Sequence, residues 1–210
     1  MRVRRSNASL SLVVGGHPRT VGDRELALGL VAGAPWAIAE TWRRFAPMVL
    51  VTAERSLGSR SEAEDISQEV FCRVFRKVKT LREPDSLRSF IYSFAVRVLK
   101  AELRRRKVRG WFPFLQPGTP FEPDFRTVNV EARDLLKKLY ALLDRLTPRD
   151  RLVFVLRRME SMTVEEIAAT MDISTSTVKR SMAHASTRLS GWIAADPGLA
   201  GLMRTECWEG

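Results

Sequence analysis

The feature that most restricts this chain is a segment near its C-terminal end, TVEEIAATMDISTSTVKRSMAHASTRL. It opens with Thr163 and Glu166, which have the spacing of a capping box that starts a helix. Apolar residues then recur at helical intervals as far as Met171, which predicts a short first helix. Asp172 and Ile173 would form a turn, with the Ile173 side chain directed inward.

A second helix is predicted directly after this turn. Ser174 can cap it, and apolar residues repeat along one side from Val178 to Leu189. The opposite side carries short polar and cationic side chains: Ser176, Thr177, Lys179, Arg180, Ala183, His184 and Thr187. Such side chains suit a helix that lies in the major groove of DNA. The segment therefore predicts a helix-turn-helix, although two packed helices with a solvated polar face would give the same pattern.

The charge balance indicates the kind of partner. Lys and Arg total 35 against 24 Asp and Glu, so the formal net charge is +11 and the isoelectric point is near 10.6. This excess favours a polyanion, either nucleic acid or an acidic membrane surface. No apolar run approaches the roughly 18 residues of a membrane span, so we expect nucleic acid and no membrane span. With 210 residues, 45% of them hydrophobic, the chain can form two small domains.

The residues needed for enzymatic or metal chemistry are scarce. Cys72 and Cys207 are the only cysteines, and they form neither a CxxC motif nor a cluster with histidine. The sequence also lacks a Ser/His/Asp set and a glycine-rich phosphate loop. We therefore expect no catalytic residues, no metal site and no cofactor. A chain without a disulfide framework is typical of the reducing cytoplasm.

Helical patterns fill the N-terminal half after a basic leader at residues 1–21, which we expect to be disordered. The pattern predicts two helices between Asp23 and Pro47 and a third over the apolar segment 48–57. The next helix is predicted over 61–78, with Ser61 and Glu64 as a second capping box. Its polar side carries Asp65, Gln68 and Glu69, which alone would indicate plain solvated surface, and Cys72 is expected to pack at the edge of its apolar stripe.

Basic residues concentrate along the following predicted helix, from Phe90 to about residue 107. Between Arg97 and Arg109 there are seven basic residues and one acid, Glu102. Aromatic residues precede them directly, a combination that can hold the backbone and the bases of single-stranded DNA. Phe94 is expected in the core, whereas Tyr92 is compatible with either the core or a base contact.

A proline-rich segment, residues 108–128, separates this part from a second predicted domain at residues 129–192. The segment has four prolines between residues 113 and 123, so we expect a linker, although its aromatic residues could also contact a partner. The second domain begins with a leucine-rich helix, and Thr147 and Pro148 mark the start of the next one. Residues 193–210 form a tail without a readable pattern.

Three motifs in this order resemble a known family. AEDISQEVFCRVFR, RSFIYSFAVRVLKAELRRRK and LTPRDRLVFVLRRMESMTVEEIAATMDISTSTVKRSMAHASTRL are similar to segments of bacterial RNA polymerase sigma factors of the extracytoplasmic function group. The resemblance implies an all-α protein with two small domains, sigma region 2 at residues 22–107 and sigma region 4 at 129–192, joined by a flexible linker. It also implies core RNA polymerase and promoter DNA as partners, with an anti-sigma factor as a further candidate, and no enzymatic activity.

The resemblance assigns roles to individual residues. Asp65, Gln68 and Glu69 would contact core polymerase, and Tyr92, Arg97, Lys100 and Arg104 would contact the minus-10 element. Arg157, Ser176, Thr177, Lys179, Arg180 and His184 would contact the minus-35 element.

This sequence also departs from the family pattern at several positions. It has Arg97 and Ala101 where an Asn and an Asp are usual, and Asp172 where the turn glycine is usual. The promoter sequence therefore cannot be copied from relatives, and His184 could be a base contact or simply an exposed residue. The main alternative to a sigma factor is a stand-alone helix-turn-helix regulator that binds duplex DNA without polymerase.

Overall fold

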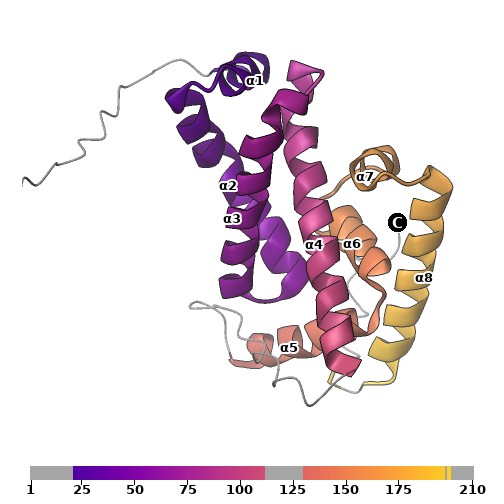
Figure 1. Ribbon diagram of the computed structural model, residues 1–210. Helices are drawn as coiled ribbons and strands as arrows, with labels where there is room; N and C mark the ends of the chain where they lie inside the picture. Colours follow the sequence, from indigo (N-terminus) through magenta and orange to yellow (C-terminus); the bar gives the residue numbers. More distant parts are fainter. Residues whose placement is uncertain (1–20, 112–129, 197, 200–210) are drawn as a thin grey trace, which may run out of the picture.

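The computed structural model describes residues 21–111, 130–196 and 198–199, and these residues form an all-α protein (Figure 1). Nearly all of the expected leader, most of the linker and most of the C-terminal tail lie outside the described residues. Within the described part there is no β-strand, so the predicted all-α fold is confirmed.

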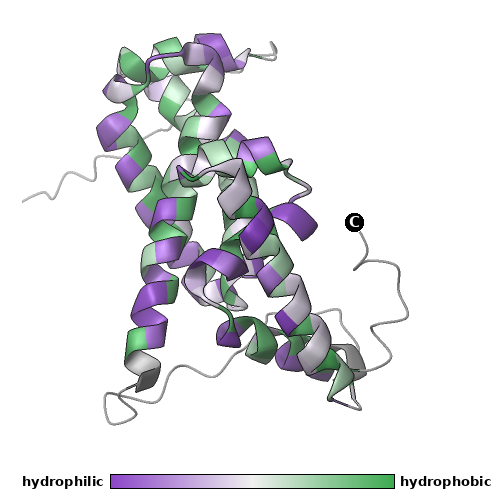
Figure 2. Cartoon of the chain, turned by 90° about the vertical axis from the view of Figure 1, so that its right-hand side faces the viewer, coloured by the Kyte–Doolittle hydropathy of each residue, from purple (hydrophilic) through white to green (hydrophobic). Residues whose placement is uncertain are grey.

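The first four helices form the N-terminal part of the molecule. They are α1 (Asp23–Val31), α2 (Pro35–Leu57), α3 (Arg60–Lys77) and α4 (Leu87–Trp111), with short 3-10 turns η1 (Val78–Thr80) and η2 (Pro84–Ser86) before α4. Their apolar sides meet in a buried cluster that includes Leu26, Phe45, Phe71 and Ile91. Figure 2 shows hydrophobic and hydrophilic residues alternating along the helices of the molecule, as expected of amphipathic helices around a core.

Four further helices complete the chain: α5 (Val130–Arg145), α6 (Pro148–Arg158), α7 (Val164–Met171) and α8 (Thr175–Ala194). Thr147 caps α6 by accepting a hydrogen bond from the backbone of Asp150, and Pro148 takes the first helical position, as the sequence predicts. A cluster that includes Leu143, Phe154 and Leu189 holds α5, α6 and α8 together.

A third cluster joins the two parts of the molecule into one body. It combines Leu57 of α2 and Leu99 of α4 with Leu152 of α6, Ile167 of α7 and Val178 of α8, all of which are fully or almost fully buried. The long helix α4 accordingly lies between the N-terminal helices and the α6–α8 group (Figure 1). The two domains expected from the sequence therefore share a hydrophobic core in this conformation.

The prediction that helices end before Pro47 is wrong, because α2 runs through this proline without a break. A proline inside a helix costs about 3 kcal/mol, since it lacks an N–H and its ring crowds the preceding turn. Phe45 and Val49 flank it and are both buried, and burial of such a side chain contributes about 1.5–3 kcal/mol. The packing on both sides of Pro47 thus offsets its local cost.

The predicted start of the next helix is also wrong by two residues. Ser59, not Ser61, is the N-cap of α3, and its side chain accepts a hydrogen bond from the backbone N–H of Glu62. Glu64 instead forms an ion pair with Arg60 at 3.0 Å. Cys72, expected at the edge of the apolar stripe, is exposed on the polar side of α3.

The helix α4 extends beyond its predicted bounds at both ends. It begins at Leu87 rather than Phe90 and continues to Trp111, so residues 108–111 of the predicted linker are helical. The first proline that can stop this helix is Pro113, and a single glycine at position 110 does not suffice to end it.

Candidate nucleic-acid interface

The predicted capping box at the start of α7 is confirmed. The Thr163 hydroxyl accepts a hydrogen bond from the Glu166 N–H at 3.1 Å, and Glu166 Oε2 accepts one from the Thr163 N–H at 2.8 Å. The hydrogen bond from the Thr163 backbone lowers the pKa of the Glu166 carboxyl. This reciprocal pair fixes the point at which the chain enters the helix-turn-helix.

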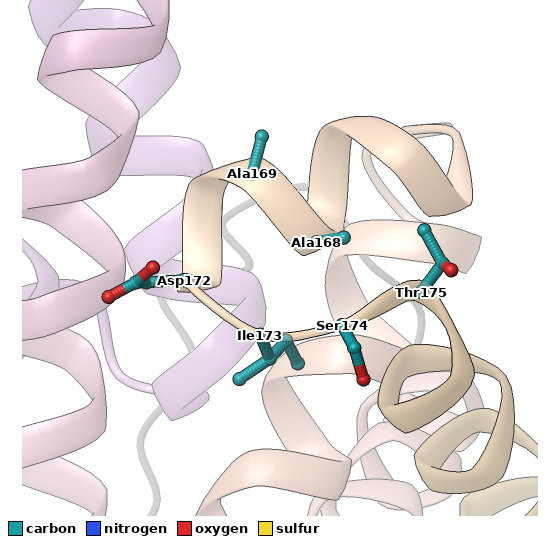
Figure 3. Close-up of a pocket in the computed structure, with 6 residues that line it drawn as sticks. All are labelled: Ala168, Ala169, Asp172, Ile173, Ser174 and Thr175. Carbon is teal, nitrogen blue, oxygen red and sulfur yellow. The ribbon is translucent and has the colours of Figure 1, made fainter.

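The turn between α7 and α8 depends on the backbone of Asp172. This residue is left-handed, with φ 54° and ψ 56°, a conformation that Asp tolerates better than most residues other than glycine. Ile173 packs against the shared core and donates its N–H to the Ala168 carbonyl at 3.0 Å. Figure 3 shows this turn, with Ala169 and Ile173 on opposite sides of it, lining an open hollow in the surface.

The outer side of α8 presents a cationic surface. Lys179 and Arg180 are exposed, while Val178, Ala185 and Leu189 on the other side are buried. In the part of the chain that the structure describes, neither Lys179 nor Arg180 has an acidic partner. Both cations are therefore available to bind a phosphate or a base edge.

Two other predicted residues of α8, Ser176 and Thr177, contribute to its N-terminal cap. The Ser174 hydroxyl lies 2.9 Å from the Ser176 hydroxyl and 2.8 Å from the Thr177 hydroxyl, and it accepts the Thr177 N–H at 3.2 Å. Ser176 is exposed, whereas Thr177 is half-buried. Their hydroxyl groups lie at the first turn of α8, where the free backbone N–H groups of a helix also point.

Arg157 near the end of α6 is half-buried and holds the chain between α6 and α7. Its Nη1 donates a hydrogen bond to the Met162 carbonyl at 3.1 Å. The guanidinium has further N–H donors, so this bond does not exclude a DNA contact.

His184 lies on the exposed side of α8, with 54% of its side chain accessible, and makes a polar contact that sequence reasoning missed. Its Nδ1 is 2.9 Å from Oδ2 of Asp150, a residue at the N-terminal end of α6 that is only 3% exposed. The Thr147–Asp150 spacing is a recognisable cap pattern, but nothing in the sequence links position 150 to position 184. The histidine is thus anchored on one side and open to solvent on the other.

The basic residues of α4 divide into a set without an acidic partner among the described residues and an ion-paired set. Arg97 and Arg104 are exposed and Lys100 is half-buried, and none of the three has an acidic partner among the described residues. Arg105 instead pairs with Glu102 at 2.6 Å, and Arg106 pairs with Glu62 and donates to the Leu57 carbonyl. The three residues predicted as DNA contacts therefore belong to the set without an acidic partner.

Tyr92, the fourth residue predicted at the minus-10 element, is buried with 5% of its surface exposed. Arg88 lies over its ring, with the guanidinium carbon 5.9 Å from the ring centre. Phe94 is also buried, as expected, and Arg97 covers its ring at 4.7 Å. In this conformation the Tyr92 ring has no open face on which a base could stack.

The exposed side of α3 carries the three residues predicted as a polymerase contact. Asp65, Gln68 and Glu69 are all exposed, and Glu69 pairs with Arg73 one turn later at 2.6 Å. Cys72 lies one turn after Gln68 on the same side. The surface is therefore a continuous polar strip along one helix.

The described residues offer no other obvious chemical site. No group of three or more His, Cys, Asp and Glu side chains gathers there in a way that could hold a metal ion. None of the described helices has the length and apolar composition that crossing a bilayer requires.

Comparisons with known proteins match both parts of the chain. Residues 41–109 match the family Sigma-70 region 2, and residues 136–189 match Sigma-70, region 4. Over 138 residues the chain is 33% identical to the ferric citrate uptake sigma factor FecI of Escherichia coli, covering 62% of this chain and 76% of FecI. It is also 30% identical over 158 residues to the ECF RNA polymerase sigma factor SigE of Mycolicibacterium smegmatis, covering 74% of this chain and 61% of SigE.

The chain belongs to the extracytoplasmic function group of sigma-70 factors. As a sigma factor it binds core RNA polymerase and directs transcription initiation at specific promoters, and a stand-alone regulator is not favoured. Sigma factors as a family are initiation factors rather than enzymes.

Solved structures share the fold of this sigma factor. The structure of CnrH in complex with the cytosolic domain of CnrY has a TM-score of 0.58 at 23% identity, covering 83% of this chain and 98% of CnrH. RpoE from Bartonella quintana, in complex with the anti-sigma factor NepR, has the same TM-score at 16% identity, covering 75% of this chain and 97% of RpoE. In this sigma factor, the region 2 match covers α3 and all but the last two residues of α4, and the region 4 match covers α6, α7 and α8 as far as Leu189.

Proposed function

We propose that the two domains of this sigma factor divide promoter recognition between them. Residues 22–107 would bind core polymerase and the minus-10 element, and residues 129–192 would bind the minus-35 element. The observation that carries this proposal is the pair of exposed cationic surfaces, one on α4 and one on α8, in the two segments that match different sigma regions. Both surfaces consist of side chains that have no acidic partner among the described residues.

At the minus-35 element, α8 enters the major groove with Lys179 and Arg180 as its main contacts. Their exposure and charge suit both phosphate oxygens and guanine edges. Ser176, Thr177 and the first turn of α8 contact a neighbouring phosphate through hydroxyl and backbone N–H groups, and His184 reads a base edge. Arg157 contacts the same DNA while it holds the turn before α7 in place.

At the minus-10 element, Arg97, Lys100 and Arg104 bind the backbone of the melted strand. Unstacking a base costs a few kcal/mol, and the release of counterions by three cations is one contribution that offsets this cost. Tyr92 contacts DNA only after a rearrangement that exposes its ring, because it is buried in this conformation. The backbone contacts of the three cations therefore make up most of this interface.

The exposed side of α3 binds core polymerase through Asp65, Gln68 and Glu69. Two carboxylates and an amide on one helix side suit a basic or hydrogen-bonding surface on the partner. Glu69 exchanges its bond with Arg73 for a bond to polymerase, at small cost because exposed ion pairs contribute little.

An anti-sigma factor is proposed as a further partner, and the cytoplasm as the place of action. The structures of CnrH and RpoE are complexes, RpoE with the anti-sigma factor NepR and CnrH with the cytosolic domain of CnrY. Their overall fold is similar to that of this chain, which supports a comparable mode of control here. Core polymerase and promoter DNA are both cytoplasmic in bacteria, so a sigma factor must meet them there. We propose that this sigma factor has no enzymatic activity and binds no cofactor.

One pair of measurements tests the division of labour. In a gel shift with promoter DNA, the chain should bind weakly alone and tightly after core polymerase is added. Run-off transcription with purified core polymerase should then start at promoters that require both elements. Equal DNA affinity with and without polymerase would favour the stand-alone regulator instead.

A further inference from the structure

The Asp150–His184 contact links the recognition helix to a buried acid of another helix. Oδ2 of Asp150 accepts a hydrogen bond from the Thr147 hydroxyl at 2.7 Å and lies 2.9 Å from His184 Nδ1. The backbone N–H of Asp150 in turn donates to the Thr147 hydroxyl oxygen at 3.1 Å. The same carboxylate oxygen, Oδ2, therefore contacts both the cap of α6 and the recognition helix α8.

The protonation state of Asp150 determines which ring nitrogen of His184 carries a proton. Burial by itself would raise the pKa of the Asp150 carboxyl, but hydrogen bonds from Thr147 and His184 outweigh burial and hold the pKa below its ordinary value. The group is thus an ionised carboxylate near neutral pH and can only accept hydrogen bonds. Nδ1 of His184 must then be the donor, and in the neutral ring Nε2 is left as an acceptor.

We infer that Asp150 is a positioning residue for base reading, which fixes the His184 ring so that Nε2 faces the major groove as a hydrogen-bond acceptor. The inference rests on the proposed contact between α8 and the minus-35 element. In the major groove the amino groups of adenine and cytosine are the donors that such an acceptor can bind. His184 would therefore favour one base pair that presents an adenine N6 or a cytosine N4 amino group.

Two features of the site support a positioning role over a merely structural one. The contact between Asp150 and His184 is not needed to cap α6. Thr147 is the N-cap of that helix and keeps this role without the His184 contact. His184 remains 54% accessible on the side chain although its Nδ1 is bonded, so its other edge is open. The same arrangement recurs in metal sites and catalytic triads. There a carboxylate accepts a hydrogen bond from one ring nitrogen of a histidine, and the other ring nitrogen binds the metal or transfers a proton.

Nuclear magnetic resonance can read the tautomer directly in the full-length protein. The chain has only two histidines, His17 and His184, so ¹⁵N-histidine labelling gives two pairs of ring-nitrogen signals, and His184→Ala identifies the pair that belongs to His184. When the ring is neutral, His184 should have its proton on Nδ1. A proton on Nε2 in the wild-type protein would overturn the inference.

Two substitutions of Asp150 should release the ring from this tautomer. Asp150→Asn keeps the shape, but its amide can turn either the carbonyl oxygen or the NH2 group toward the ring, so it no longer requires an N–H on Nδ1. Asp150→Ala removes the partner altogether, and Thr147 still caps the helix. Both substitutions should lower the fraction of molecules in which the His184 ring has its proton on Nδ1. Asp172→Asn is the matched control, since it removes one negative charge from the same helix-turn-helix at an exposed left-handed residue that Asn also tolerates.

The functional readout is base preference of the polymerase holoenzyme on promoters randomised in the minus-35 element. His184→Ala should reduce discrimination at one base pair by about three- to tenfold, the effect of one hydrogen bond. Asp150→Asn and Asp150→Ala should reduce discrimination at that same base pair, and Asp172→Asn should not. If the Asp150 variants keep the wild-type preference while His184→Ala loses it, the positioning role is wrong and the base contact stands.

If His184→Ala changes no base preference, the inference is overturned, because no contact exists to be positioned. The proposed function is tested separately by Lys179 and Arg180. If promoters still require those two cations, reading of the minus-35 element by α8 survives the failure of the His184 contact. If they do not, α8 itself is not the reader.

Discussion

Arg151 of α6 donates a hydrogen bond from Nε to the carbonyl oxygen of Ser56, at 2.6 Å, and thereby caps the C-terminal end of α2. The last carbonyl groups of a helix have no partner within it, and the negative end of the helix dipole favours a cation there. Arg151 is only 2% exposed, and its Nη1 also bonds to Asp144. A residue of the C-terminal domain therefore completes a helix of the N-terminal domain.

Replacing Arg151 with methionine should lower the free energy of unfolding by about 2 kcal/mol, because the Ser56 carbonyl is left buried without its donor. Urea denaturation followed by circular dichroism measures this change. Arg149→Met is the matched control, since Arg149 is exposed and its nearest acid is 4.0 Å away, and it should change the free energy by less than about 0.5 kcal/mol. Equal effects of the two substitutions would show that the Ser56 contact contributes nothing.

The shared core predicts that the two domains separate when this sigma factor engages a promoter. The minus-10 and minus-35 elements are named for positions roughly 25 base pairs apart, and this separation spans about 85 Å of B-DNA. A single body of about 160 residues has a radius of gyration of only about 15 Å, so it cannot reach both elements. Opening requires the buried contacts between α2, α4 and α6 to break, at a cost that polymerase and DNA binding must offset.

Fluorescence energy transfer between α1 and α8 measures this separation. Glu25→Cys and Gly191→Cys provide exposed label sites, and a side chain at position 191 meets no atom within 4 Å. In a Cys72→Ser, Cys207→Ser background, the labelled chain should show higher transfer alone than in the promoter complex with polymerase. Unchanged transfer in an active complex would rule out the separation.

Alanine at both Lys179 and Arg180 should abolish transcription that depends on the minus-35 element and leave binding to core polymerase intact. If these two cations bind phosphates as proposed, their removal also weakens the salt dependence, so the slope of log affinity against log salt should fall by up to about two. Run-off transcription and salt-dependent binding by the holoenzyme measure both effects. Arg133→Ala with Lys137→Ala removes the same charge from two exposed positions of α5. This double substitution should change neither the transcription nor the salt dependence of binding.

Local rules predicted much of this fold. The caps at Thr147, Thr163 and Ser174 each depend on residues within three positions, and all three are confirmed. The helix-turn-helix follows from the same short-range patterns, and the resemblance of three ordered motifs identified the family.

Contacts between distant residues account for what the sequence did not reveal. Pro47 continues a helix because other helices bury its neighbours, and Tyr92 is buried although its aromatic ring also fits a DNA surface. The bond between Asp150 and His184 joins residues 34 positions apart on two helices. No periodicity or spacing encodes such a pair, since it depends on how α6 crosses α8.

The exposed thiol of Cys72 gives a direct test of the proposed polymerase surface. Cys72 lies on the same side of α3 as Gln68 and Glu69, so bound polymerase should cover it. In a Cys207→Ser background, core polymerase should slow the reaction of Cys72 with a maleimide, and prior labelling should weaken polymerase binding. Undiminished labelling of the polymerase-bound protein would exclude this side of α3 from the interface.

Charge reversal tests the same surface without a label. Asp65→Lys together with Glu69→Lys should weaken binding to core polymerase by about tenfold or more, because like charges would then face each other across the contact. Titration of labelled sigma factor with core polymerase gives the dissociation constant. Glu25→Lys, at an exposed position of α1, serves as the control and should leave the dissociation constant unchanged.

The Asp150 carboxylate should make the stability of this protein sensitive to acid. Its pKa is lowered in the folded state, so its contribution is complete above the ordinary carboxyl pKa of about 3.9 and is lost as the pH falls through the lower folded value. Asp150→Asn cannot titrate, so the difference in unfolding free energy between the wild type and this variant should be largest near neutral pH and should shrink below about pH 4. Urea unfolding across a pH series measures the difference, with Asp172→Asn as the control. A difference that stays constant down to pH 2 would mean that hydrogen bonds to Asp150 do not favour its charged form.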